Sequence, residues 1–430
     1  MGLTTYRNIS IPEGDRRLCG SYILQHVPRI LITLVLTFEG DNLMSTTAKP
    51  FRLLYRNTMH KKESIRTWLV SRIRVASITA FFTLSAMLCF SATVSAQHYQ
   101  QTNLVSDLPG LAVTTDLNLV NPWGIARSQT SPWWVSDNGT GVSTLYNGSG
   151  QIIPLVVTIP PPPGGTGPST PTGVVFNGSS DFTVAPGLPA RFIFVTQDGT
   201  ISGWNPTANP TNAIITVNNS GSAIYTGATL GQRAGANLLY VANFFGSTIN
   251  VFDTNFAPFP LGAGAFTDPS LPEGFAPFNV QNINGTIFVA FAKQDEDRED
   301  EVAGAGLGFV DAFDANGTLL LSLRSGRWMN APWGIALSPA NFGKLGNRLL
   351  VGQFGSGEIA SFDPENGNFL GLLRGPQGQP LTIEGLWGLE FGNGAAAGPA
   401  NVLFFAAGIE DEEHGLFGSI TPIPQGANLE

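Results

Sequence analysis

Two short stretches in the C-terminal half of the chain concentrate its carboxylates. Residues 292–301 read AKQDEDREDE and residues 408–414 read GIEDEEH, so ten carboxylates fall in two loops. Clustered carboxylate oxygens on flexible loops suit a hard cation such as Ca²⁺, which takes about 6–8 oxygen ligands. One interpretation is therefore a Ca²⁺ site, with the candidate metal ligands Asp295, Asp297, Asp300, Glu301, Glu410, Asp411 and Glu413.

The spacing within the first stretch does not complete a known calcium loop. Asp295, Asp297 and Glu299 alternate like the start of an EF-hand, but Asp300 stands where that loop requires glycine. The alternative interpretation is a solvated acidic loop that holds no metal, and both interpretations stay open.

His414 follows the second acidic stretch directly. Only His98 and His414 occur after residue 96, so any histidine-dependent base of that segment would have to be His414. Its neighbouring carboxylates should raise its pKa and favour imidazolium, which is a poor general base. We expect a structural role or a contact with a ligand.

A repeated phrase shows which elements must position these loops. Asn-Pro-Trp-Gly-Ile-Ala at 121–126 returns as Ala-Pro-Trp-Gly-Ile-Ala at 331–336 and, altered, as Gly-Leu-Trp-Gly-Leu-Glu at 385–390. The glycine of this phrase, which we use as the register position, lies at 124, 334 and 388. Weaker copies place the same position at 173, 227 and 279. Six copies with a period of about 53 residues indicate a repeat architecture.

Each copy continues with β-branched and aromatic runs separated by turns, which predicts four antiparallel strands per repeat. The fold class is therefore all-β, a six-bladed β-propeller. A helical solenoid is excluded because no sustained helical periodicity occurs in 97–430. The last repeat ends after its third strand, and residues 99–105 form a spare strand. We predict that this strand completes the last blade and closes the ring.

Loops between the second and third strands of the blades should share one face, around the central channel. Both acidic stretches occupy this loop position, and insertions there usually mark the functional face. The short loops and the repeated phrase add candidate ligand contacts beside His414. The tryptophans either pack between blades, ring the channel mouth or form a sugar-stacking platform. These candidates are Asp137, Asn243, Gln353, Trp123, Trp333 and Trp387.

The N-terminal part has a different character. The formal net charge of −9 hides a basic segment, 1–96, and a strongly acidic remainder. Residues 59–96 show a basic region, an apolar run and small residues up to Ala96, which predicts a signal peptide and a secreted or periplasmic protein. An N-terminal anchor is the alternative, although the apolar run is short for a membrane span. Residues 1–58 are predicted to be a non-native upstream extension, and 97–430 to be the propeller.

The segment after Ala96 lacks cysteine, since Cys19 and Cys89 both precede it, so it has no Cys-ligated metal. Its acidity excludes nucleic acid as a partner, and we expect no membrane span in it.

The phrase at 121–126, together with Gln353–Gly357 (QFGSG) and Glu413–Gly418 (EHGLFG), resembles a family of exported bacterial six-bladed propellers. That family lies within the NHL and SMP-30/gluconolactonase-like superfamily. The resemblance implies the fold but no activity, and the Glu, Asn, Asn and Asp metal ligands of gluconolactonases have no matching positions here. The leading hypothesis is a binding or scaffold module with an acidic loop face, whose partner is a protein or a carbohydrate. The alternatives are a metal-dependent hydrolase or lactonase-like enzyme with its site in the central channel, and a structural surface protein.

Overall fold

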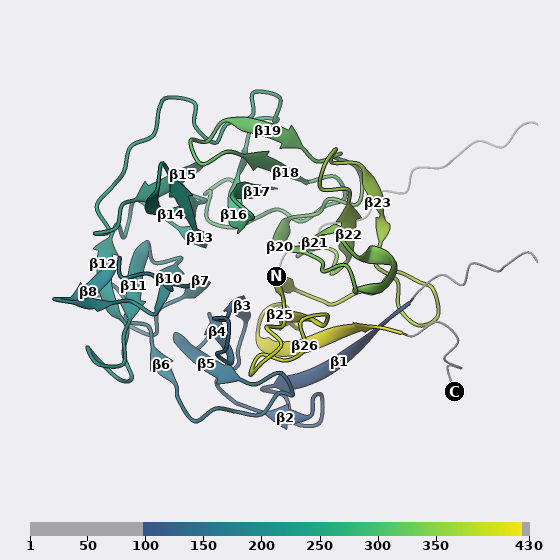
Figure 1. Cartoon of the computed structure of the whole chain (residues 1–430), viewed down its shortest axis with the longest axis horizontal. Coiled ribbons are helices and arrows are strands. Elements are labelled where there is room, and N and C mark those ends of the chain that lie inside the picture. Colours follow the sequence, from purple (N-terminus) through teal and green to yellow (C-terminus); the bar gives the residue numbers. More distant parts are fainter. Residues whose placement is uncertain (1–97, 424–430) are drawn as a thin grey trace, which may run out of the picture. The chain divides into compact units, whose positions relative to one another are not determined.

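The computed structural model describes residues 98–423, which form six blades around a central axis (Figure 1). Every blade is an antiparallel sheet whose innermost strand carries the repeated phrase. Within the described range there is no α-helix, only the 3₁₀ turn η1 (Gly343–Leu345), and no helix long and apolar enough to span a membrane. The predicted all-β class and six-bladed propeller are confirmed. The predicted leader, 1–58 and 59–96, lies outside the described residues.

In the first three blades the strands follow one another outward from the axis in chain order. Blade one contains β3 (Pro122–Ala126), β4 (Trp133–Asp137), β5 (Val142–Tyr146) and β6 (Val157–Thr158). Blade two contains β7 (Pro171–Phe176), β10 (Phe192–Thr196), β11 (Thr200–Trp204) and β12 (Ile214–Asn218), with a small hairpin of β8 (Thr183–Ala185) and β9 (Leu188–Pro189). Blade three contains β13 (Tyr225–Arg233), β14 (Ala236–Asn243) and β15 (Thr248–Phe252).

The remaining blades also start from the innermost strand. Blade four contains β16 (Phe275–Ile283), β17 (Thr286–Lys293), β18 (Gly308–Phe313) and β19 (Leu319–Ser322). Blade five contains β20 (Pro332–Leu337), β21 (Leu349–Gln353), β22 (Ile359–Phe362) and β23 (Phe369–Leu372). Blade six contains β24 (Leu386–Phe391), β25 (Leu403–Ile409), β26 (His414–Pro422) and β1 (Tyr99–Ser106), with β2 (Thr114–Thr115) added in parallel to β1.

The ring closes through the N-terminal strand, as the sequence predicted. β1 pairs antiparallel with β26, from Tyr99 opposite Pro422 to Ser106 opposite Leu416, with a bulge between Asn103 and Val105. Blade six thereby gains its outer strand from the opposite end of the described chain. This pairing covers the edge that β26 would otherwise expose.

Blade three departs from the predicted four strands. After β15 the chain reads Phe256-Ala-Pro-Phe-Pro, and only an isolated bridge joins Phe252 to Pro258. Proline has no N–H to donate to a strand ladder, so Pro258 and Pro260 prevent a regular fourth strand here.

The repeated glycine has a steric cause. A Cβ added to Gly124 would lie 2.5 Å from the carbonyl oxygen of Thr172, and one added to Gly388 would lie 2.6 Å from that of Trp123. In each case the close neighbour belongs to the innermost strand of the next blade. The innermost strands therefore approach one another backbone to backbone at the axis, which only glycine permits.

Blade four has Asn279 in place of this glycine, and its side chain contacts the innermost strand of the next blade. The Asn279 Nδ2 donates to the carbonyl of Trp333 in blade five at 2.8 Å, and its Oδ1 accepts from the N–H of Val280 at 2.8 Å. The same side chain fills the space beside Gly227 of blade three. A side-chain hydrogen bond thus links blades at the one register position that is not glycine.

Candidate functional site

The loop-face half of the axis is filled by aromatic side chains. Trp123 stacks on Trp387 with ring centroids 3.6 Å apart, and Trp333 meets both edge-on at 6.2 and 5.9 Å. Phe354 stacks on the Trp387 ring at 4.0 Å. Phe278 and Phe244 complete the group, which we call the axial aromatic cluster.

The three repeat tryptophans are therefore core residues that contact one another across the axis. Each is at most 5% exposed. The Trp387 Nε1 donates to the Oδ1 of Asn121 at 3.3 Å, and the Trp333 Nε1 donates to the carbonyl of Thr226 at 3.0 Å. A sugar-stacking platform needs an open ring face, which these side chains do not offer.

A local backbone distortion aims the tryptophans at the axis. Asn121, Ala331 and Gly385, two residues before each tryptophan, have φ values of 44°, 48° and 59°. The innermost strands β3, β20 and β24 then have an irregular pairing with the second strand of their blade. The irregularity lies between Pro122 and Ile125, Pro332 and Ile335, and Leu386 and Leu389. Such bulges re-aim a side chain out of the regular alternation, so the Trp-Gly pair leaves the blade surface and turns inward.

The opposite end of the channel is narrow. A cavity of about 30 Å³ remains there, lined by the register glycines 124, 173, 334 and 388, by Asn279 and by Glu390 among others. This volume suits about one water molecule. Together with the axial aromatic cluster, it leaves no room for a substrate in the central channel of the described residues.

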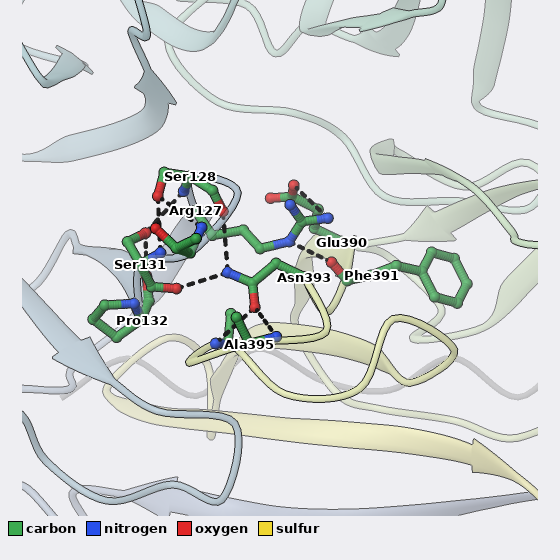
Figure 2. A network of polar contacts seen from close by, with 10 residues as sticks. Arg127, Ser128, Ser131, Pro132, Glu390, Phe391, Asn393 and Ala395 are labelled. Carbon is green, nitrogen blue, oxygen red and sulfur yellow. Dashed lines mark hydrogen bonds and ion pairs between the residues drawn. The ribbon is translucent and has the colours of Figure 1, made fainter.

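Figure 2 shows the polar network that joins blades six and one at this end. The Arg127 Nη2 lies 3.6 Å from the Oε1 of Glu390, and its Nε donates to the Phe391 carbonyl at 2.6 Å. The Asn393 Nδ2 donates to the carbonyls of Ser128 and Ser131 at 3.0 and 2.8 Å. Burial raises the pKa of Glu390 to about 7, against the opposing effect of Arg127. We assign these groups to ring closure.

On the loop face, the two acidic stretches approach each other. One lies between β17 and β18 and the other forms the turn between β25 and β26. Burial, together with the charges of Glu412, Asp300 and Asp295, raises the pKa of Glu301 to about 8. Burial and the Asp300 charge also raise the pKa of Glu412. Ala303, two residues after Glu301, and Glu412 line the same cavity, so both insertions lie on one face. We call Glu301 and Glu412 the acidic ridge.

Glu412 was not among the predicted ligand residues, although it lies in the predicted stretch. Its Oε2 accepts a hydrogen bond of 2.6 Å from the Nδ2 of Asn121, the same Asn that contacts Trp387. Glycine at 408 makes room, because a Cβ there would meet the Asn121 Oδ1 at 2.2 Å. Four consecutive acidic residues give no sign in the sequence of which one turns inward.

The turn that carries Glu412 has an unusual backbone. Glu410, Asp411 and Glu412 have φ values of 53°, 56° and 66°, three successive non-glycine residues in the left-handed region. Such conformations cost on the order of 1 kcal/mol or more each and concentrate at ligand-binding segments. The turn is held by its two flanking strands, β25 and β26, and by the Asn121 contact.

The predicted metal ligands are not gathered into one site. The Asp295 Oδ1 accepts from the Glu299 N–H at 3.0 Å within its own loop, and Asp297, Glu410, Asp411 and Glu413 are exposed. Asp300 is also exposed, and Glu301 belongs to the acidic ridge. Within residues 98–423, no group of three or more His, Cys, Asp and Glu side chains is arranged to hold a metal ion.

His414 pairs with Asp107, which is not among the predicted site residues. Its Nδ1 lies 2.6 Å from the Oδ2 of Asp107, whose Oδ1 accepts from the Gly415 N–H at 2.8 Å. Its Nε2 lies 3.9 Å from the Oε2 of Glu410. The pKa of His414 is raised, as expected, but chiefly by the hydrogen bond to Asp107. Asp107 is 307 positions away, so no sequence pattern links the two residues.

Three other predicted ligand contacts accept backbone hydrogen bonds within the fold. Asp137 is fully buried, its Oδ2 accepts from the Thr144 N–H at 3.0 Å, and burial raises its pKa well above the usual range. Asn243 accepts from the N–H groups of Ile224 and Gly246. Gln353, also fully buried, accepts from the Asn330 N–H at 2.8 Å. The donors lie in different segments: Thr144 in β5, Gly246 in the turn after β14, and Asn330 just before β20.

Two cavities open on the loop face, one on each side of the axis. The first, about 490 Å³, adjoins blades two, three and four and includes Phe245, Asp198, Glu299 and Asp300 in its lining. The second, about 430 Å³, adjoins blades five and six and includes Phe354, Ser356, Glu384, Asp411 and Glu412. Neither lining contains a lysine or an arginine.

No family model matches the chain. An uncharacterised protein of Acanthamoeba polyphaga mimivirus is 31% identical over 327 residues, covering 74% of this chain and 78% of that protein. A second uncharacterised protein of the same virus is 30% identical over 327 residues, covering 74% and 84%. These relatives are viral, whereas the resemblance seen in the sequence pointed to bacterial proteins.

Among solved structures, a streptogramin B lyase is similar at 13% identity and a TM-score of 0.44, covering 76% of this chain and 98% of that one. A glucose dehydrogenase is similar at 12% identity and a TM-score of 0.45, covering 76% and 100%. At these values the two similarities say nothing about activity.

Proposed function

The chain belongs to the family that includes these two mimivirus proteins, and on the geometry of its loop face we propose that it is an exported binding module for a positively charged ligand. The observation that carries the proposal is the acidic ridge. Glu301 and Glu412 come from different blades, each has a raised pKa, and neither forms an ion pair with a lysine or arginine in residues 98–423.

The electrostatics of the ridge favour a cation. Partly buried carboxylates resist ionisation, chiefly because burial disfavours the charged form and also because nearby negative charges are unfavourable. A positively charged group placed beside them would offset this penalty and lower both pKa values. Binding should therefore release protons near neutral pH and should strengthen as the pH rises.

The closed channel supports a binding role over the alternative of a hydrolase or lactonase-like enzyme with its site at the axis. The axial aromatic cluster and the small cavity below it fill the channel, whereas the loop face carries two accessible cavities. Calcium is the simplest cation suggested by the sequence. Since the carboxylates are not arranged to hold a metal, a Ca²⁺ site would require the two acidic loops to move together.

Export is part of the proposal and rests on the sequence of 59–96. Its test is the N-terminal sequence of the protein recovered from an expressing bacterium with a periplasm. We expect a chain that begins at Gln97 and is found outside the cytoplasm. An intact leader on protein found in the cytoplasm would contradict export without affecting the binding proposal.

The binding proposal can be tested with spermine and Ca²⁺ as probes, by titration calorimetry of the full chain at pH 6, 7 and 8. We expect binding of at least one probe, tighter at higher pH, with proton release visible as a heat that depends on the buffer. Glu301→Gln and Glu412→Gln should weaken it by at least several-fold. Glu365→Gln, an exposed carboxylate in the turn between β22 and β23, is the matched control.

Binding that is absent for both probes would overturn the proposal. Binding that is equal in Glu301→Gln, Glu412→Gln and Glu365→Gln would also overturn it, because a general effect of net charge would then explain the result. Circular dichroism of each variant confirms that the fold is retained.

A further inference from the structure

The larger loop-face cavity has an aromatic wall as well as acidic ones. It is lined by Thr170, just before β7, and by Gln197 and Asp198 in the turn between β10 and β11. Phe245, in the turn between β14 and β15, lines it from blade three, and the insertion of blade four closes it with Glu299 and Asp300. A volume of about 490 Å³ is in the range of small-ligand sites.

One carboxylate of this cavity is fixed by its surroundings. The Asp198 Oδ2 accepts from the hydroxyl of Ser169 at 2.6 Å and from the Thr170 N–H at 2.9 Å. Its other oxygen has no such partner within the described residues. Asp300 has a raised pKa from burial and from the nearby Asp295 charge. The cavity therefore presents acceptor oxygens without a basic side chain among its lining residues.

The chain itself shows that Phe245 accepts a guanidinium. The Arg298 Cζ lies 4.8 Å from the centroid of the Phe245 ring, a cation–π contact. Arg298 has a φ of 62° and directly precedes Glu299 and Asp300. This contact does not involve the carboxylates, and it shows that the face of the ring is accessible to a guanidinium.

We infer that this cavity binds an arginine side chain of a basic peptide, with the guanidinium on Phe245 and its N–H groups directed to Asp198, Glu299 and Asp300. The inference rests on the proposed function and specifies its ligand. A guanidinium is planar, stacks on aromatic rings and presents donors that match carboxylates, whereas a hydrated metal ion makes no use of the Phe245 face. Arg298 occupies the ring in the free protein and competes with the incoming arginine.

The test uses acetyl-Gly-Arg-Gly-Arg-Gly-amide and the same peptide with citrulline in place of arginine, titrated into the full chain. Citrulline keeps the shape of the side chain and removes its charge. We expect the arginine peptide to bind at least tenfold more tightly. Phe245→Leu, which keeps apolar volume but removes the aromatic face, should weaken binding about tenfold, and Asp300→Asn should weaken it several-fold. Arg298→Ala should tighten it several-fold.

Matched controls exist elsewhere in the chain. The Arg233 Cζ lies 5.5 Å from the Phe259 ring centroid, outside this cavity. Arg233→Ala and Phe259→Leu therefore repeat the charge loss and the ring loss at a remote cation–π pair and should leave binding unchanged. Glu384→Gln removes an exposed carboxylate from the other cavity and should also have no effect.

The outcomes separate this inference from the proposed function. If spermine binds but the arginine peptide does not exceed the citrulline peptide, the guanidinium site is wrong while the acidic binding face stands. If peptide binding is unaffected by Phe245→Leu and Asp300→Asn, or responds equally to Glu384→Gln, the assignment to this cavity is overturned. If neither spermine, Ca²⁺ nor the peptide binds, both proposals fail.

Discussion

His414 and Asp107 share a contact of 2.6 Å between Nδ1 and Oδ2, and the same Asp107 accepts from the Gly415 N–H at 2.8 Å. Asp107 directly follows β1, and His414 begins β26. The pair therefore fastens the two strands that close the ring at their loop-face end. Arg127, Glu390 and Asn393 join blades six and one at the opposite end (Figure 2).

The His414–Asp107 contact predicts that the stability of the closed ring depends on pH. The pKa of His414 is raised in the folded protein, so protonation stabilises the fold. Its contribution is complete below the unfolded pKa of about 6.5 and is lost as the pH rises through the higher folded value. His414→Gln should therefore lower the Tm more at pH 6 than at pH 9. His98→Gln is the control, and an equal effect of His414→Gln at both pH values would contradict the assignment.

The register glycines should be essential for stability, because the innermost strands approach closely at these positions. Gly124→Ala and Gly388→Ala place a methyl group within about 2.6 Å of a backbone oxygen of the next blade. We expect each to lower the free energy of unfolding by about 1–3 kcal/mol, as overpacking does, measured by urea unfolding. Gly262→Ala, whose added Cβ would meet no atom within 4 Å, is the control. Equal stability of all three variants would refute the close approach of the innermost strands.

The raised pKa of Glu301 predicts that the protein becomes less stable as the pH rises, whereas a salt-bridged carboxylate has the opposite effect. Its folded pKa of about 8 exceeds the ordinary 4.5, so the folded protein retains a proton that the unfolded chain releases. The free energy of unfolding should fall between pH 4.5 and about 8 and then level off. Glu301→Gln should raise it by about 1–3 kcal/mol at pH 9 and leave it unchanged at pH 4. Glu296→Gln, on the same loop but exposed, should have little effect at either pH.

The burial of Trp387 predicts a large effect on stability. Trp387→Ala should lower the free energy of unfolding by about 3–5 kcal/mol. Trp387→Phe should recover part of this loss, because the ring can still stack on Trp123 and Phe354. A destabilisation below about 1 kcal/mol for the alanine variant would contradict the placement of Trp387 in the core.

The fold was readable from the sequence because its signals are local and repeated. The repeated phrase and the β-prone runs define one blade, and the same pattern recurs in six repeats. The spare strand at 99–105 indicates how the ring closes. Blade three was the exception. The repeat pattern predicts a fourth strand there, but the prolines at 258 and 260 prevent it from forming.

The site was less accessible to sequence reasoning, for a physical reason. The acidic loops could be located from their composition, but Asp107, Asn121 and Phe245 take part through contacts with residues far away in the sequence. Asp137 and Gln353 look like loop residues in the sequence and are completely buried. Which polar groups face solvent is decided by the turn geometry, and single-sequence patterns do not specify it.

The pairing of β1 with β26 also bears on how the molecule is made. β1 precedes every other blade strand along the chain and β26 follows them all, so the last blade cannot be completed until the whole propeller has been synthesised. Closing so long a loop carries an entropy cost that grows only slowly with length, but contacts this distant in sequence form slowly. A nascent chain that stops before His414 would leave β1 without its partner. The unclosed ring would then expose two strand edges that can pair with another copy, as in a domain-swapped assembly.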